Sequence, residues 1–351
     1  MTGKRKELAS MASKHFSVYA PNMAIDMGTA NIIVATSDKG IIKNDPSVLA
    51  LDIVSKKVLA KGKAAKDLIG KSPENLVAVK PFSNGAVSDF ELSKALIEYY
   101  IHETGPNFCL FGPTVVMAMS SFGGDIEQRA LQDAVYQAGA REVILVDQAL
   151  AAAYGAGFID KKSGSGGTLV VDCGAGISSV SIVSTYGLIT SQCLHKGGDY
   201  LDKEISKLLR NKFDIIIGEN SAESLKIEIG SLAADKQKNA MQIGGRDALS
   251  GMPRSIDVYG SDLYPVFEKF GQELALCIKK TLEKTPPELA AEIVGRGLCL
   301  TGGLALLDGL AQYLENKLEI RVIMSENPVE DVAKGCLVLL RSKKSDVRGR
   351  V

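Results

Sequence analysis

The alternation of apolar and polar positions predicts two copies of one β-hairpin. Residues 23–40, MAIDMGTANIIVATSDKG, give an apolar strand, a D-x-G turn, a second apolar strand and a glycine. Residues 168–187, TLVVDCGAGISSVSIVSTYG, repeat this order about half a chain later. Two similar hairpins at this separation indicate a duplicated architecture with two similar lobes.

The segments between and after the hairpins alternate between helical and strand patterns. Residues 126–140 have apolar side chains at helical spacing, and the strand pattern EVILVD and an alanine-rich helix follow. Residues 273–294 predict a helix, a break at two prolines and a second short helix. Residues 221–232 predict a charged, exposed helix. Strands that alternate with helices are typical of an α/β protein with a mixed sheet.

Length and charge narrow the class of protein. A chain of 351 residues exceeds what one core usually supports, so we expect two domains or lobes. The 41 basic and 41 acidic residues leave no net charge. A general electrostatic attraction to nucleic acid is therefore not expected, and we predict no nucleic-acid partner.

The cysteines, the histidines and the N-terminus bear on chemistry and location. The six cysteines are scattered without a C-x-x-C pair, which indicates free thiols in a reducing compartment. The three histidines are isolated, which argues against a histidine-based metal centre or catalytic triad. We find no membrane span and no apolar signal-peptide core behind the basic N-terminus, so we expect a cytoplasmic protein.

The two hairpin turns carry the candidate chemistry. An aspartate, Asp26 or Asp172, ends the first strand of each hairpin, and glycines follow it. Backbone N–H groups of a glycine turn can approach phosphate oxygens, and the aspartate can hold Mg²⁺ or its water. Two ordinary β-turns are the alternative, because Asp and Gly are common in turns. The repetition with matched strands favours a nucleotide site.

Three other features give weaker signals. Gly302 and Gly303 form a third glycine turn, where backbone could approach a ring or a sugar. Lys226 and Glu228 lie two apart and do not share a helix face, which by itself favours a solvated helix. The apolar cluster 107–111 fits either core or an exposed patch that meets a partner or a bilayer.

These segments together resemble MreB, the bacterial actin family, from about Met23 to Leu340. The blocks that carry the resemblance, in chain order, are MAIDMGTANIIV, SPENLVAVKPFSNGAVSDF, QAGAREVILVDQALAAAYGAG, VDCGAGISSVSIVS, HKGGDYLD, SAESLKIEIGS and LTGGLALLDGL. The resemblance implies an α/β, actin-like (duplicated ribonuclease-H-like) fold with two lobes and four subdomains around a nucleotide cleft. It also implies binding of ATP or ADP with Mg²⁺ and homopolymer filaments that support cell shape or shape-linked motility. Co-filaments with paralogues are a further implied partnership.

The resemblance also implies a domain layout. We expect a flexible N-terminal arm over residues 1–20 and a first lobe over 21–160, with a small subdomain inserted at about 42–76. A second lobe follows over 161–330, with a small subdomain inserted at about 190–255. Residues 331–351 return to the first lobe and end in a basic tail that we expect to fray after Leu340.

Site residues are implied by the same motifs. They fall into a first phosphate loop, a second phosphate loop, neighbours of the ribose and phosphates, a helix that borders the nucleotide, and an adenosine turn. In that order they are Asp26, Gly28, Thr29, Ala30 and Asn31; Asp172, Gly174, Ala175 and Gly176; Gly197, Gly198 and Asp199; Glu223, Lys226 and Glu228; Gly302 and Gly303. Asp26 and Asp172 would hold the metal through water. Phe108, Leu110 and Phe111 fall where MreB proteins carry a membrane-inserting loop, which implies a peripheral cytoskeletal location on the inner membrane face.

The chain departs from the family at the hydrolysis chemistry. MreB typically has a glutamate where this chain has Gln148, and a threonine and a glutamate where it has Ile177 and Ser179. A carboxylate can accept a proton from water, whereas an amide can only orient the water. Eukaryotic actin also has glutamine and an aliphatic residue at these two places and hydrolyses ATP, but it has a histidine where this chain has Ser179. We therefore predict at most a slow ATPase, with Gln148 and Asp172 in a weakened site.

A small-molecule kinase of the same superfamily is the alternative function. Such a kinase needs a catalytic base, usually an aspartate, to deprotonate the acceptor hydroxyl. Asp147 is the one nearby candidate, and as the residue before Gln148 it is expected to point away.

Overall fold

The computed structural model describes residues 17–69, 71, 75–83, 86–104, 109–122, 124–159 and 166–348. Contacts divide the chain into two compact units. The first unit comprises residues 1–68, 73–151 and 332–351, and the second unit comprises residues 69–72 and 152–331. The chain leaves the first unit within α5 (Gln148–Gly155) and returns to it at the start of α11 (Asp331–Arg348).

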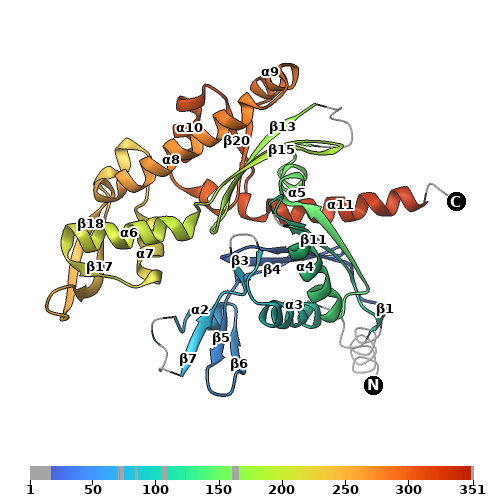
Figure 1. Cartoon of the computed structure of the whole chain (residues 1–351), viewed down its shortest axis with the longest axis horizontal. Coiled ribbons are helices and arrows are strands. Elements are labelled where there is room, and N and C mark those ends of the chain that lie inside the picture. Colours follow the sequence, from blue (N-terminus) through green and yellow to red (C-terminus); the bar gives the residue numbers. More distant parts are fainter. Residues whose placement is uncertain are drawn as a thin grey trace, which may run out of the picture. The chain divides into compact units, whose positions relative to one another are not determined.

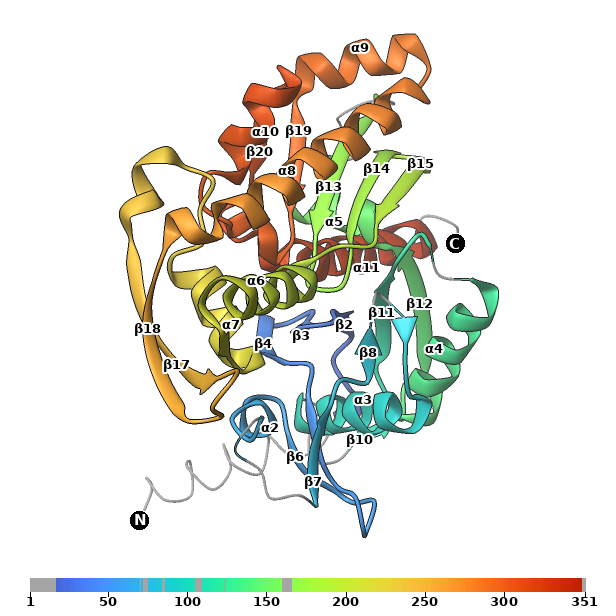
Figure 2. The same ribbon diagram turned by 60° about the vertical axis from the view of Figure 1, so that its left-hand side comes forward.

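A five-stranded mixed sheet forms the centre of the first unit (Figure 1), in the order β12-β11-β2-β3-β4, with all five strands labelled in Figure 2. Its strands are β2 (Met23–Met27), β3 (Asn31–Thr36), β4 (Gly40–Pro46), β11 (Thr114–Met119) and β12 (Glu142–Asp147). β2, β3 and β4 pair antiparallel, whereas β11 joins β2 and β12 in parallel. The first predicted hairpin is therefore β2–β3.

The second unit repeats this sheet strand for strand, in the order β15-β14-β13-β19-β20. Its strands are β13 (Thr168–Cys173), β14 (Ser178–Ser184), β15 (Gly187–Leu194), β19 (Leu298–Thr301) and β20 (Val322–Met324). The parallel and antiparallel pairings match, and so does an irregularity in register, at Val34/Ala35 in one sheet and Ile182/Val183 in the other. The predicted duplication and mixed sheet are confirmed.

Apolar residues in the central strands and in the neighbouring helices form a separate core in each unit. In the first unit Leu96, Ile97 and Tyr100 of α3 (Phe90–Thr104) are fully buried in the cluster that contains β2. In the second unit α8 (Gly260–Glu283) covers β14 and β15 and buries Phe267 and Phe270 (Figure 2). Burial of each such large side chain contributes about 1.5–3 kcal/mol to folding.

The remaining larger helices lie between the sheet strands in sequence. They are α4 (Asp125–Gln137) in the first unit, and α6 (Gly198–Phe213), α9 (Pro287–Arg296) and α10 (Leu310–Leu318) in the second. Short elements are α2 (Lys63–Lys66), β8 (Phe82–Ser83), β9 (Ala86–Val87), η1 (Ala234–Lys238), η2 (Gly303–Leu306) and η3 (Pro328–Glu330).

Each unit also has a small inserted sheet of three strands. The first is β6 (Val58–Lys61), β5 (Leu49–Asp52) and β7 (Leu76–Val79), and the second is β16 (Ile215–Ile216), β17 (Ala240–Asp247) and β18 (Pro253–Tyr259). The second insertion includes α7 (Glu219–Glu228), which lies beside α6 (Figure 1).

The two insertions share one turn chemistry. Asp52 Oδ1 accepts the N–H groups of Val54 at 2.9 Å and Ser55 at 2.7 Å. Asp247 Oδ1 accepts those of Leu249 at 3.1 Å and Ser250 at 2.8 Å. A D-x-x-S turn therefore follows the first strand of the hairpin in both insertions. An aspartate that accepts the backbone N–H groups two and three residues later is common in turns.

Two predictions about chain segments are wrong in part. Ser17–Tyr19 form β1, which pairs in parallel with β10 (Cys109–Phe111), so the predicted flexible arm does not include residues 17–19. The predicted loop around residues 107–111 is strand at Cys109–Phe111, and Phe108 lies outside the described residues. Such short strands form through partners distant in the sequence, which a local pattern cannot reveal.

The C-terminal segment and the predicted charged helix also differ from expectation. α11 continues to Arg348, beyond the predicted fraying point, through a stretch with four Lys or Arg residues and with no proline, and no glycine before position 349. α8 begins at Gly260, well before the predicted start. α7 ends at Glu228 and buries Ala222 and Leu225, so it is not an exposed helix.

Candidate functional site

The glycine turn of the second unit has its carbonyl groups committed. Gly174 N–H donates to Ile177 O at 3.0 Å and closes the turn between β13 and β14. The carbonyls of Gly174 and Ala175 then accept the N–H groups of Gly198 at 3.1 Å and Asp199 at 2.9 Å. Because these donors are the first residues of α6, the N-terminus of α6 is hydrogen-bonded to the glycine turn. Those two N–H groups are therefore not available to a ligand.

The later N–H groups of this turn, in contrast to its carbonyl groups, have no backbone partner among the described residues. Among the described residues, no backbone carbonyl accepts the N–H of Ala175, Gly176 or Ile177. Successive backbone N–H groups without partners form a concavity that favours an anion. The turn therefore has the donors that a phosphate group would need, and Ile177 contributes its backbone while its side chain is half-buried.

Two glycines next to this turn are required by space. A Cβ at Gly197 would overlap Ala175 O and lie 2.6 Å from Gly174 O. Gly302 has φ +84, and a Cβ there would lie 2.5 Å from both Asp172 Oδ1 and Cys173 O. The start of α6 and the turn after β19 can therefore approach the glycine turn closely only because these positions lack side chains. Asp172 itself is buried, opposite Thr301 in the β13–β19 pair.

Lys226 completes this group from α7. Its Nζ donates to Asp202 Oδ2 at 2.8 Å and to Gly198 O at 3.2 Å, and 12% of its side chain is exposed. The interpretation of Lys226 as part of a solvated helix face is therefore wrong, because its partner lies on the neighbouring helix. Glu223 is half-buried on the same helix, whereas Glu228 is exposed.

Asp202 is the residue that the sequence reasoning missed. It follows Gly198 by four positions, so the two lie one turn apart on the same face of α6. The sequence did contain a hint, since Asp202 is a carboxylate one helical turn after the glycine pair at residues 197 and 198. Its role could not be predicted, because its partner Lys226 lies on α7 and no local pattern places α7 beside α6.

The hairpin turn of the first unit repeats the arrangement. Ala30 O accepts the N–H of Ser47 at 2.8 Å, and no backbone carbonyl among the described residues accepts the N–H of Thr29 or Ala30. A Cβ at Gly28 would lie 2.7 Å from Asn31 O. Asp26, which has partners of its own, lies opposite Ile33 in the β2–β3 pair. This turn too commits a carbonyl and leaves N–H donors.

Gln148 and Asp147 stand where β12 passes into α5. Asp147 Oδ1 accepts the N–H groups of Ala149 at 2.9 Å and Leu150 at 3.1 Å, and Oδ2 accepts Ser121 Oγ at 2.5 Å. The carboxylate is therefore committed to capping α5 and to Ser121, which leaves it poorly suited to act as a kinase base. Gln148, the first residue of α5, is half-buried and has partners.

The predicted site residues thus form two groups. One lies in the first unit at the β2–β3 turn and the start of α5. The other lies in the second unit, where the structure brings together the β13–β14 turn, residues 197–199, Lys226 and Gly302. Gly303 has open space around it, and Glu228 is exposed, so neither is drawn into the second group by contacts.

The described residues contain neither a cluster of metal-binding side chains nor a helix suited to cross a membrane. Within the described part of the chain, no three or more His, Cys, Asp and Glu side chains cluster as a metal site. Mg²⁺ sites built from one or two carboxylates, waters and substrate phosphates do not need such a cluster. No helix among the described residues has the length and apolar character to cross a bilayer.

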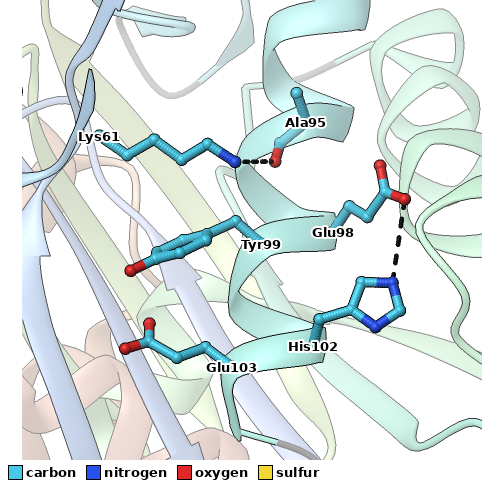
Figure 3. A pocket seen from close by; sticks show the side chains of 6 residues that line it. All are labelled: Lys61, Ala95, Glu98, Tyr99, His102 and Glu103. Atoms are coloured by element: carbon cyan, nitrogen blue, oxygen red, sulfur yellow. Dashed lines mark hydrogen bonds and ion pairs between the residues drawn. The ribbon is translucent and has the colours of Figure 1, made fainter. Parts of the chain in front are cut away.

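A separate hollow of about 530 Å³ lies between β6 and α3 (Figure 3). Lys61 Nζ donates to Ala95 O at 3.5 Å and lies 4.6 Å from the centroid of the Tyr99 ring. His102 pairs with Glu98 at 3.8 Å, and Glu103 pairs with Lys43 at 2.7 Å. The charged side chains that line the hollow contact one another or a neighbouring residue, and the hollow is separate from the two glycine turns.

Comparisons with known proteins agree with this geometry. The family model described as MreB/Mbl protein matches residues 20–347. The cell shape-determining protein Mbl of Bacillus subtilis (strain 168) is 36% identical over 92% of this chain and 96% of its own length. The cell shape-determining protein MreB of Escherichia coli (strain K12) is 33% identical over 93% of this chain and 94% of its own length.

Solved structures give the same result for the fold. MreB5 of Spiroplasma citri bound to AMPPNP superposes with a TM-score of 0.89, at 28% identity, over 94% of this chain and 99% of that chain. The same protein bound to ADP gives 0.88 at 29% identity, over 93% and 98%. A MamK double helical filament chain gives 0.76 at 19% identity, over 92% and 99%, which speaks for the fold alone. The predicted actin-like α/β fold is confirmed, the kinase alternative gains no support, and the chain belongs to the MreB/Mbl family.

Proposed function

We propose that this chain is an ATP-binding, actin-like cytoskeletal protein that polymerises into filaments supporting cell shape and that hydrolyses ATP slowly. One observation carries the nucleotide part: in both hairpin turns carbonyls accept N–H groups of neighbouring backbone, while adjacent N–H groups of the turn have no backbone acceptor within the described part of the chain. The relatives named for cell shape, and the MreB5 structures with AMPPNP and ADP, support the same function.

The residues present fit a nucleoside triphosphate. The N–H groups of residues 29–30 and 175–177 would donate to phosphate oxygens. Asp26 and Asp172 would hold Mg²⁺ through water, and the ion would neutralise phosphate charge when bound. Gly302, which accommodates no side chain, would let backbone approach the adenosine. Lys226 and Glu223 would border the nucleotide from α7.

Slow hydrolysis follows from two side chains. Gln148 can orient a water molecule through its amide, but it cannot take the water's proton as a carboxylate could. Ile177 places an aliphatic side chain where the family's hydroxyl would be. We infer that the filament holds ATP for longer than an MreB that has both the glutamate and the threonine.

Self-association is the other half of the proposal. One protein of this fold, MamK, is described in a double helical filament, and membership of the MreB/Mbl family supports the same proposal for this chain. Co-filaments with paralogous chains are an extension of the same proposal, and co-pelleting of a labelled paralogue with this protein would test it. A cytoskeletal location at the inner face of the membrane is part of the proposal.

The membrane part rests on exposed apolar side chains. Leu110 and Phe111 both belong to β10, and their exposed fractions are 61% and 45%. We propose that this segment contacts the bilayer. Leu110→Ser with Phe111→Ser should reduce co-sedimentation with vesicles of an anionic bacterial lipid extract. Leu249→Ser, which changes a residue that is 87% exposed in the second unit, is the control. Equal binding by all three proteins would reject the role of this segment.

Purified protein with and without Mg-ATP tests the proposed function. ATP binding measured by displacement of a fluorescent analogue, and sedimentation of polymer at increasing protein concentration, should both be positive. The proposal fails if the protein neither binds the nucleotide nor forms a polymer that pellets.

A further inference from the structure

A largely but not fully buried ion pair joins α6 to α7 beside the glycine turn of the second unit. Lys226 Nζ lies 2.8 Å from Asp202 Oδ2, with 12% of the lysine side chain and 16% of the aspartate side chain exposed. The same ammonium donates to Gly198 O at 3.2 Å. The lysine is therefore held at two points.

Stability alone does not account for this pair. Asp202 Oδ1 is buried without a hydrogen-bond partner among the described residues. Burial raises the pKa of the Asp202 carboxyl, and the attraction of Lys226 opposes this shift without cancelling it. Buried ion pairs can often be replaced by apolar residues at no loss of stability. Asp202 keeps one carboxylate oxygen that is unpaired within the described part of the chain, so stability alone does not explain the pair. The pair is better explained by the position in which it holds the Lys226 ammonium, next to the glycine turn.

The ammonium is held next to the glycine turn. A Cβ built on Gly198 would lie 3.1 Å from Lys226 Nζ and 3.5 Å from Ala175 Cα. Gly198 N–H in turn donates to Gly174 O at 3.1 Å. An ammonium has three N–H donors, of which Asp202 and Gly198 O engage two, so the third remains for a ligand.

An exposed ion pair on the same helix provides the contrast. Lys207 Nζ lies 2.6 Å from Glu204 Oε1, with 70% of the lysine side chain exposed. Exposed pairs of this kind contribute little and fix no geometry. The pair Asp202–Lys226 differs in being much less exposed and in contacting the backbone carbonyl of Gly198, whose N–H bonds the glycine turn.

We propose that Asp202 is a positioning residue of the nucleotide site, which orients the Lys226 ammonium so that its third N–H meets an oxygen of the bound nucleotide. The inference rests on the proposed nucleotide site. The oxygen acceptor belongs either to the ribose or to the phosphates, and the experiment separates these sources.

A double-mutant cycle on nucleotide affinity is the test. The affinity of the full-length protein for ATP is measured for wild type, Asp202→Asn, Lys226→Met and the double variant. Each single change should weaken binding by roughly tenfold, the effect of losing one hydrogen bond to a charged group. The double variant should bind no more weakly than Lys226→Met, because Asp202 acts through Lys226.

Several outcomes overturn the proposal. It fails if Asp202→Asn or Lys226→Met binds ATP as wild type does, or if the two effects add in full. A merely structural role would lower the Tm of Asp202→Asn and leave the affinity of the folded fraction unchanged. Asp202→Glu keeps a carboxylate and should restore part of the affinity. If Asp202→Asn does not fold, Lys226→Met and Asp202→Glu still decide the matter.

Controls and a second ligand complete the design. Glu204→Gln removes a charge from the same helix and should leave affinity unchanged. Inorganic tripolyphosphate as competitor distinguishes the acceptor: a loss of affinity for tripolyphosphate in Lys226→Met indicates a phosphate oxygen, and a loss for ATP alone indicates a ribose oxygen. If the wild type does not bind ATP at all, the proposed function fails; if it binds and Asp202→Asn binds equally, only this inference fails.

Discussion

Gly302 lies so close to Asp172 that a Cβ on the glycine would be 2.5 Å from the carboxylate oxygen Oδ1. Asp172 is the second-last residue of β13 and Gly302 directly follows β19, and Asp172 pairs with Thr301 across these two parallel strands. The glycine turn at Gly302 therefore packs directly against Asp172, the aspartate that precedes the glycine turn at residues 174–176. A turn that reads as a weak isolated signal in the sequence is thus part of one local structure.

Gly302→Ala should therefore displace either Asp172 or the turn. The substitution combines the clash with a φ of +84, and we expect a loss of about 1–3 kcal/mol in the free energy of unfolding together with weaker ATP binding. Urea unfolding and ATP affinity are the measurements. Gly303→Ala is the matched control for stability, because a Cβ there meets nothing within 4 Å. Equal stability of the two variants would contradict the geometry.

Gly335 of α11 gives a second prediction. A Cβ at this position would overlap the carbonyl of Ala151 in α5, and backbone cannot yield as a flexible side chain can. Gly335→Ala should reduce the free energy of unfolding by about 3 kcal/mol. Gly295→Ala, in the last turn of α9 with open space around it, should instead stabilise by about 0.5 kcal/mol through helix propensity. Thermal unfolding of both variants shows whether the opposite signs appear.

Cys193 gives a prediction about pH. Burial raises the pKa of its thiol to about 11. Only the thiolate reacts with alkylating reagents, so at pH 8 Cys193 should react about 100-fold more slowly than an ordinary thiol. The rate should rise about tenfold per pH unit up to the pKa. Mass spectrometry of iodoacetamide-treated protein measures it, with Cys193→Ser to assign the peptide. Rapid alkylation of Cys193 at pH 7 would show that burial does not raise the pKa of this thiol.

The sequence anticipates the parts of the fold that repeat or that lie within a hairpin. Asp26 and Asp172 each lie one residue before the end of a strand that leads into a glycine turn, and both hairpins form where the pattern predicts them. The pairing of β1 with β10 and the partnership of Lys226 with Asp202 were not predictable in this way. Both depend on segments that tertiary packing brings together, and the local pattern has no information about them.

The weakened hydrolysis site gives the fourth prediction. Gln148→Glu supplies a carboxylate that can accept a proton from water, and Ile177→Thr supplies a hydroxyl after the glycine turn. The double variant should release phosphate from Mg-ATP at least ~10-fold faster than wild type. Ile177→Val with Gln148→Asn, which adds neither group, serves as the control. If the double variant releases phosphate no faster than wild type, these two positions do not limit hydrolysis.

The nucleotide content of the polymer tests the central claim most directly. Protein incubated with Mg-ATP is pelleted, and the nucleotide in the washed pellet is extracted and quantified. The account predicts a pellet with about one nucleotide per chain, as expected for a single site, and more ATP than ADP at times when the Gln148→Glu, Ile177→Thr variant holds mostly ADP. A pellet without bound nucleotide, or no pellet under any nucleotide condition, would contradict it.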